Sequence, residues 1–247
     1  MSVLGHNERI RQSGDDRVPC SGSGRDPRVF GRELSSGSWS GGPGSRSCRS
    51  VNTAHTPRVS LEENLARVQE RIAAACGRAG RDPATVTLLA VSKNHPAATV
   101  SEAVSLGISL FGENRIQEAR VKIPASSGRA RWHFIGHLQS NKAREAVGLF
   151  EMIESLDSLG LAGELQKQAE KQARTIRVLA EINVAGESSK FGWNPSRFLE
   201  ELAALNAFPR LELNGLMTVA PYSTDPERAR PVFRRLRELR DEASARL

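Results

Sequence analysis

The sequence predicts an α/β fold in which a parallel sheet is covered by helices. Two observations carry this prediction: six short apolar stretches have the pattern of buried strands, and helical patterns separate most of them. Strands that alternate with helices are typical of parallel sheets. A closed parallel barrel needs eight strands, whereas an open doubly wound sheet needs fewer. No G-x-G-x-x-G pattern follows the first strand, so the dinucleotide-binding form of the open sheet has little support.

The first expected helix begins at Ser60, because Ser60 and Glu63 have the spacing of a capping box. Apolar residues then recur every three or four positions, which is the pattern of one buried helix face. Those residues are Leu61, Leu65, Val68, Ile72 and Cys76. The next elements in chain order are a strand at 88–93, a helix at 97–106, and strands at 110–114 and 131–136.

The second half of the chain continues the alternation. Ser140 is a candidate cap for a helix, and Asn194 and Asp225 are each followed by proline, which favours the first position of a helix. The expected strands are 152–157, 178–183 and 211–219, and the expected helices are 141–149, 158–173, one that opens at Asn194-Pro195 and one that opens at Asp225-Pro226.

Residues 1–58 are expected to form a disordered tail before a domain at 59–247. Gly, Ser, Arg and Pro dominate the tail, and such a segment cannot bury enough apolar surface to offset its ordering entropy. The tail holds nine Arg, no Lys and five acidic residues, so it carries +4 of the formal net charge of +7. The acidic residues weaken the interpretation as a transit peptide, which leaves a plain tail or a start codon placed too far upstream.

Composition argues against several classes of protein. The domain is nearly balanced in charge and the tail has no nucleic-acid-binding module, so a nucleic-acid binder is the least favoured class. Cys20, Cys48 and Cys76 form no C-x-x-C pair, which argues against a disulfide framework or zinc site and fits a reducing compartment. No apolar run approaches the roughly 20 residues of a membrane span. We expect a cytoplasmic protein without a membrane partner.

Polar residues at the strand ends are the candidates for chemistry, because the functional groups of such barrels gather where the strands end. Lys93 follows an apolar strand, so its amine is expected at the mouth of the fold. A partly desolvated lysine amine loses its charge more readily and becomes a nucleophile toward aldehydes. The spacing alone leaves open a solvated lysine at a strand end. The other candidates are Asn114, His133 with Gly136, Asp157, Asn183, and Met217 with Thr218.

Three residues near these strand ends leave alternatives open. Asn114 can orient a ring hydroxyl or a phosphate, or it can cap the following helix. Glu113 can act as a base, although pairing with Arg115 or Lys142 is favoured. His133 stands between two aromatic residues and is favoured as a hydrogen-bonded core residue over a ligand. The five histidines show no metal-binding spacing.

Five motifs occur in one order and at compatible spacing within residues 60–247. They are Ala90-Val-Ser-Lys93, Phe111-Gly-Glu-Asn114, Trp132-His-Phe-Ile-Gly136, Leu138-Gln-Ser-Asn-Lys142 and Gly215-Leu-Met217. Together they resemble the pyridoxal phosphate homeostasis proteins, which are single-domain relatives of the alanine racemase N-terminal barrel. The resemblance implies a TIM-type (β/α) barrel of that kind, with about six strands present here.

The resemblance also implies a function. Lys93 matches the family's Schiff-base lysine, and Asn114, His133, Gly136 and Met217 match positions around the cofactor. The implied protein binds pyridoxal 5'-phosphate, helps to regulate its supply to the enzymes that use it, and has no established catalysis. The alternative is a pyridoxal-phosphate-dependent enzyme of the racemase kind. It needs an acid/base residue on the far face of the cofactor ring, for which the sequence offers no convincing candidate.

The end of the chain departs from the family pattern. The resemblance implies a continuation after the last helix, with two more strands and the groups that cradle the cofactor phosphate. The sequence ends at Leu247 before that continuation. We therefore expect an incomplete barrel, with unpaired strand edges, from a truncated gene product or a fragment.

Overall fold

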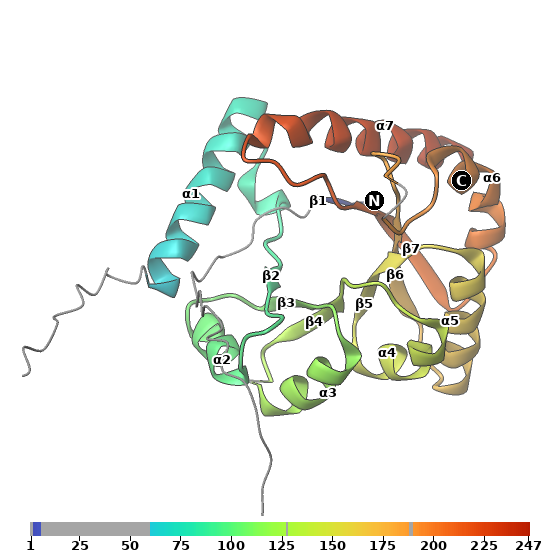
Figure 1. Cartoon of the computed structure of the whole chain (residues 1–247), viewed down its shortest axis with the longest axis horizontal. Coiled ribbons are helices and arrows are strands. Elements are labelled where there is room, and N and C mark those ends of the chain that lie inside the picture. The colour runs from blue at the N-terminus through green and yellow to red at the C-terminus, as the bar shows by residue number, and fades with distance from the viewer. Residues whose placement is uncertain (1, 6–59, 127, 188–189) are drawn as a thin grey trace, which may run out of the picture. The chain divides into compact units, whose positions relative to one another are not determined.

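A parallel sheet of seven strands is the scaffold of the described residues. The computed structural model describes residues 2–5, 60–126, 128–187 and 190–247. The strands are β1 Ser2–Gly5, β2 Ala90–Val91, β3 Leu110–Glu113, β4 Arg131–Phe134, β5 Met152–Leu156, β6 Ile176–Glu181 and β7 Leu211–Thr218. Their order is β1-β7-β6-β5-β4-β3-β2, and every neighbouring pair is parallel (Figure 1). Strands β2 to β7 are the six that the sequence predicts.

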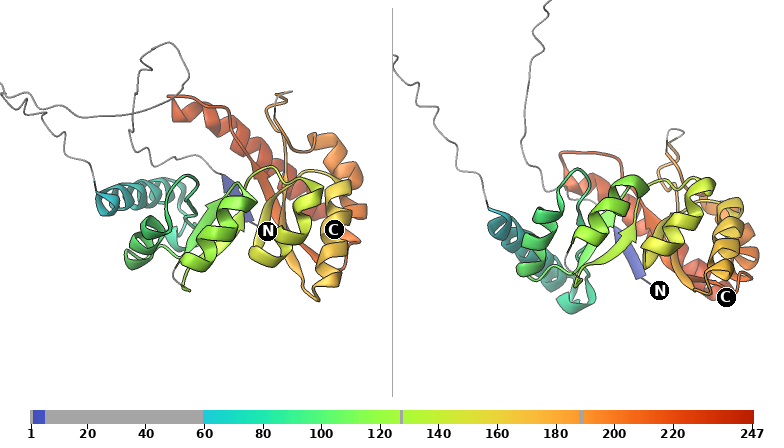
Figure 2. Two further views of the ribbon diagram at one scale, coloured as in Figure 1. Left: turned by 60° about the horizontal axis from the view of Figure 1, so that its bottom comes forward. Right: turned by 90° about the horizontal axis from the view of Figure 1, so that it is seen from below.

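Helices lie around the outer side of the curved sheet (Figure 1). They are α1 Leu61–Ala79, α2 Ala97–Ser105, α3 Ile116–Ala125, α4 Ala143–Leu149, α5 Leu159–Lys171, α6 Pro195–Asn206 and α7 Arg230–Arg246, with short 3-10 helices η1 Pro83–Thr85, η2 Ser140–Lys142 and η3 Pro226–Ala229. Figures 1 and 2 place α1 and α2 near β2, at one end of the row of strands, and α7 beside β1 and β7 at the other end. Among the described residues, none of the helices has the length and apolar character that a membrane span requires. The alternation of strands and outer helices confirms the predicted α/β class.

Side chains on β6 alternate between the two faces of the sheet. Val178 and Ala180 lie in the large core that the strands form with the helices, whereas Leu179 clusters with Met152 and Met217 in a separate small group. Successive side chains of a strand point to opposite faces. Glu181, the last residue of β6, is therefore on the face of Leu179, which is the inner face of the curved sheet.

A short strand lies within the range that the sequence predicts as a disordered tail. Ser2–Gly5 form β1, which pairs with β7 from Ser2 opposite Gly215 to Gly5 opposite Thr218. The rest of the predicted tail, residues 6–58, lies outside the described residues.

Helix α3 is an element that the apolar pattern does not predict. Its buried residues are Ile116, Ala119 and Lys122, so a lysine occupies the inward face where an apolar residue would be expected. Pro124 also stands in its last turn. A buried charge on the packing face removes the periodicity from which the helix could have been recognised.

The helix caps follow the prediction at two positions and differ at a third. Asn194 caps α6 and Asp225 caps η3, each accepting a hydrogen bond from a backbone amide two residues further on. Ser140 instead begins η2, and its side chain does not cap α4. A 3-10 turn that leads into a helix makes its own backbone hydrogen bonds, so the serine cap is not needed there.

Candidate functional site

The carboxyl ends of the parallel strands share one edge of the sheet, and most of the predicted site residues gather there. Lys93 follows β2, Asn114 follows β3 and Gly136 follows β4. His133 and Met217 lie inside β4 and β7, so they are one step below the edge. This edge is where barrels of parallel strands hold their functional groups.

The backbone holds Lys93 at this edge on both sides. Ser92 N donates to Gly112 O on β3 at 3.1 Å, and His95 N donates back to Ser92 O at 3.0 Å. Asn94 has a φ of 62°, the left-handed region that a tight turn requires and that asparagine tolerates. The Lys93 side chain is half-buried. Its Nζ has no hydrogen-bond or ion-pair partner among the described residues.

A buried polar network lies directly behind this turn. Lys122 Nζ on α3 donates to Glu113 Oε1 at 2.5 Å and to Ser92 O at 2.7 Å, and Ser92 Oγ donates to Glu113 Oε1 at 2.7 Å. All three residues are buried, and Glu113 has no exposed surface. The prediction that Glu113 forms an ion pair is confirmed, but its partner is Lys122. Arg115 and Lys142 pair instead with Glu118 and Glu145.

Gly136 fits against Asn114 so closely that a larger residue would force the surrounding backbone to shift. A Cβ on Gly136 would lie 2.5 Å from the Asn114 carbonyl oxygen and 2.8 Å from its Cα and Cβ. The Asn114 Oδ1 atom is buried and accepts no hydrogen bond from the described residues. Buried acceptors are nearly always bonded to something, so this atom indicates a donor that is not part of the described chain.

His133 and Met217 form part of the interior beneath the edge. His133 Nδ1 lies 2.6 Å from Glu154 Oε1 on β5, and both side chains are buried. Met217 packs with Met152 and Leu179. The interpretation of His133 as a hydrogen-bonded core residue agrees with this geometry. A role of these residues toward a cofactor stays a prediction.

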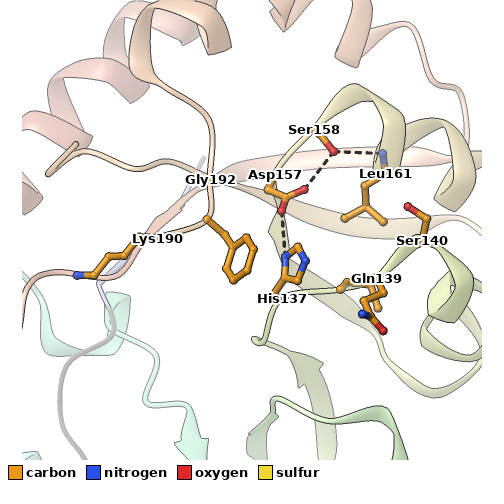
Figure 3. A pocket seen from close by; sticks show the side chains of 10 residues that line it. His137, Gln139, Ser140, Asp157, Ser158, Leu161, Lys190 and Gly192 are labelled. Atoms are coloured by element: carbon orange, nitrogen blue, oxygen red, sulfur yellow. Dashed lines mark hydrogen bonds and ion pairs between the residues drawn. The ribbon is translucent and has the colours of Figure 1, made fainter. Parts of the chain in front are cut away.

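A second polar group lies at the ends of β4, β5 and β6. His137 Nδ1 is 3.1 Å from Asp157 Oδ2, and Ser158 Oγ donates to the other carboxylate oxygen at 3.1 Å (Figure 3). The His137 ring stacks on Phe191 at a centroid distance of 3.6 Å. These residues line a cavity of about 500 Å³ that also includes Lys190.

Glu181 is the last residue of β6, and the pKa of its carboxyl is raised. Burial, and to a smaller extent the negative charge of Asp157, together raise the pKa of its carboxyl from 4.5 to about 7. The predicted strand runs to residue 183, so the sequence treats Glu181 as part of the strand interior. The period of two along the strand is the signal that could have found it, because Glu181 shares a face with Leu179 and Asn183.

Known proteins are similar to this chain over the region that contains strands β2 to β7. The family described as "Alanine racemase, N-terminal domain" matches residues 61–247. A pyridoxal phosphate homeostasis protein from Aquifex aeolicus is 44% identical over 181 residues, which cover 73% of this chain and 79% of the relative. An identity of 44% over 181 residues indicates a common fold.

Solved structures give the same result. PipY of Synechococcus elongatus without PLP has a TM-score of 0.64 and 36% identity, covering 72% of this chain and 83% of that chain. PipY with PLP bound has a TM-score of 0.62 and 35% identity, covering 72% and 82%. Alanine racemase of Clostridium difficile 630, at 14% identity and a TM-score of 0.52 over 64% of this chain and 44% of that chain, shows the fold alone.

These matches confirm the predicted fold, an incomplete TIM-type barrel of the alanine racemase N-terminal kind, and they include the strands that carry Lys93 and Asn114. The chain belongs to the alanine racemase N-terminal domain family and, within it, to the pyridoxal phosphate homeostasis proteins.

Proposed function

We propose that this protein binds pyridoxal 5'-phosphate through Lys93 and takes part in intracellular homeostasis of that cofactor without turning over a substrate. The names of the curated relatives and the PLP-bound structure of PipY support the proposal. The observation that carries it is the Lys93 amine, which stands at the carboxyl edge of the sheet without a partner among the described residues.

The residues around Lys93 fit this cofactor. When bound, the cofactor supplies an aldehyde, which is an electrophile for an amine. Lys93 offers that amine, and the turn between Ser92 and His95 fixes where its stem begins. The free Asn114 Oδ1 can accept a hydrogen bond from a ring hydroxyl. Asn114 can occupy this position because Gly136 has no side chain, and a Cβ on Gly136 would displace Asn114.

The racemase-like alternative requires an acid/base residue in addition to Lys93. A racemase needs an acid/base residue whose pKa lies near the working pH. Among the described residues Glu181 is the acid with a pKa of about 7, on a different strand from the one that precedes Lys93. Exchange of the α-proton of alanine that depends on both Lys93 and Glu181 would favour the enzyme. The low identity to alanine racemase supports the fold only, so we keep the non-catalytic function.

The partners and the compartment follow from the same proposal. A protein that manages a cofactor supply would interact with the enzymes that use pyridoxal phosphate, in the cytoplasm where a free thiol such as the buried Cys76 stays reduced. The proposal includes no membrane partner and no nucleic acid.

Titration of the full chain with pyridoxal 5'-phosphate tests the proposed function. We expect a saturable absorbance band in the visible range and a mass increase of one cofactor after reduction with borohydride. A titration that shows only the spectrum of the free cofactor would overturn the proposal. Pyridoxal without the phosphate serves as the control ligand, because it has the same aldehyde and ring.

A further inference from the structure

A second, smaller cavity lies at the carboxyl ends of β6 and β7. Its volume is about 180 Å³, below the usual range for sites of drug-sized ligands. Its lining residues are Glu181, Ile182, Asn183, Lys190, Phe191 and Val219. Ile182, Phe191 and Val219 form its apolar walls. The remaining lining residues, which are polar or charged, are Glu181, Asn183 and Lys190.

Two hydrogen-bond acceptors of this cavity have no donor within the described ranges, which omit residues 188 and 189. Glu181 is only 9% exposed, and its carboxyl has no hydrogen bond or ion pair with the described residues. Asn183 Nδ2 donates to Glu187 O at 2.8 Å and to Lys190 O at 3.4 Å, which fixes the amide orientation. The Asn183 Oδ1 atom is then buried without a donor in the part of the chain that the structure describes. At one cavity, a buried amide oxygen and a carboxylate that both lack donors among the described residues indicate a ligand that donates hydrogen bonds.

Gly192 and Trp193, which directly follow the lining residue Phe191, are held against the end of β6. Trp193 N donates to Glu181 O at 2.8 Å, and Asn183 N donates to Trp193 O at 2.9 Å. Gly192 between them has a φ of 109°, and a Cβ on it would lie 2.9 Å from Asn183 N and from Glu181 O. Only glycine allows this close approach, so the two acceptors are held at fixed positions.

The charges that face Glu181 favour a cation. Asp157 lies at the end of the neighbouring strand β5, and its own positive partner is His137. Lys190 lines the cavity, but its amine is 3.0 Å from Glu187 Oε1 and 3.4 Å from the Val219 carbonyl oxygen. His137 and Lys190 therefore already have partners, whereas the Glu181 carboxyl has none among the residues that the structure describes.

We infer that this cavity binds the primary ammonium group of a small amine or amino acid, with Glu181 and Asn183 Oδ1 as its acceptors. A primary ammonium has three N–H donors, so it can serve both acceptors at once. Neither Lys93 nor Asn114 lines this cavity, and the inference goes beyond the proposed function. Loss of cofactor binding would leave it standing.

The affinity for an ammonium ligand should depend on pH, because it depends on the charge of Glu181. An ammonium ligand binds the ionised carboxyl, and the pKa of Glu181 is about 7. The ionised fraction then rises about tenfold between pH 6 and pH 8, so the affinity should rise about tenfold as well. Binding should also release protons from Glu181 into the buffer.

Calorimetry on the full chain with methylammonium, glycine and acetate tests the inference. We expect methylammonium and glycine to bind, acetate not to bind, and the affinity of the first two to rise about tenfold from pH 6 to pH 8. Tighter binding of glycine than of methylammonium identifies an amino acid as the ligand, and the reverse identifies a simple amine. An amine can also react with the aldehyde of bound pyridoxal phosphate. Each titration is therefore repeated on Lys93→Arg, and this variant should bind methylammonium and glycine with the same affinities as the native chain.

Glu181→Gln keeps the shape of the side chain and removes its charge. It should weaken methylammonium binding by at least about tenfold and abolish the pH dependence. Glu212→Gln is the matched control, because Glu212 is exposed near the opposite end of β7. Thermal melting of both variants reports whether they remain folded. Binding of acetate, no binding of either amine, or unchanged binding to a folded Glu181→Gln variant would overturn the inference.

Discussion

Replacing Lys122 by methionine should be strongly destabilising, because it leaves the Glu113 carboxylate buried without its ion pair. The Lys122 and Glu113 side chains are 8% and 0% exposed, and one Glu113 oxygen already lacks a partner. Removing one member of a buried pair typically costs about 3–5 kcal/mol. For a domain of this size that corresponds to a thermal midpoint about 6–20 °C lower.

Two further variants separate this cause from a general effect of losing a lysine. Lys142→Met removes a lysine whose pair with Glu145 is partly exposed, and it should change the free energy of unfolding by less than about 1 kcal/mol. The double variant Glu113→Gln with Lys122→Met removes both charges and should regain part of the loss. Denaturant unfolding followed by circular dichroism measures all three. A Lys122→Met variant that loses less than about 1 kcal/mol would refute the reasoning.

Three more predictions follow from the site. Because Glu181 has a pKa near 7 in the folded chain and near 4.5 when unfolded, it makes the fold less stable as pH rises from about 4.5 to 7. The Glu181→Gln variant should have the same free energy of unfolding as the native chain at pH 4 and a value about 3 kcal/mol higher at pH 8. Denaturant unfolding at both pH values measures this difference. A difference that does not change with pH would contradict the raised pKa of Glu181. Gly136→Ala should lower the unfolding free energy by about 1–3 kcal/mol and weaken cofactor binding through Asn114; a variant with native affinity would show that Asn114 is not needed. No deuterium should enter the α-carbon of alanine from solvent; sustained exchange that Lys93→Ala abolishes, measured by proton NMR, would show an enzyme.

The sequence predicts the part of the site that depends on strand ends. Lys93, Asn114 and Gly136 each follow an apolar run, so the position of the run also locates the residue. The parallel arrangement then brings the three to one edge of the sheet. Motif spacing adds the family, which periodicity alone does not provide.

Contacts between distant residues could not be predicted in this way. Lys122 reaches Ser92 across 30 positions, and His133 reaches Glu154 across 21. Neither pair has a local spacing rule, because the fold and not the chain brings the residues together. Glu181 was missed for a related reason. An acid inside an expected strand does not indicate a cavity, because the close approach of Gly192 to the backbone of Glu181 and Asn183 is a contact of the fold.

Borohydride reduction followed by peptide mapping tests the central claim most directly. The full chain is saturated with pyridoxal 5'-phosphate, reduced and digested, and the modified peptide is identified by mass. We predict that the label is on Lys93, and that Lys93→Arg loses both the label and the visible absorbance band, because guanidinium does not form the bond. Lys142→Arg, the matched control, should keep both. A label on Lys142 or Lys190, or a Lys93→Arg variant that keeps the absorbance band, would contradict the account.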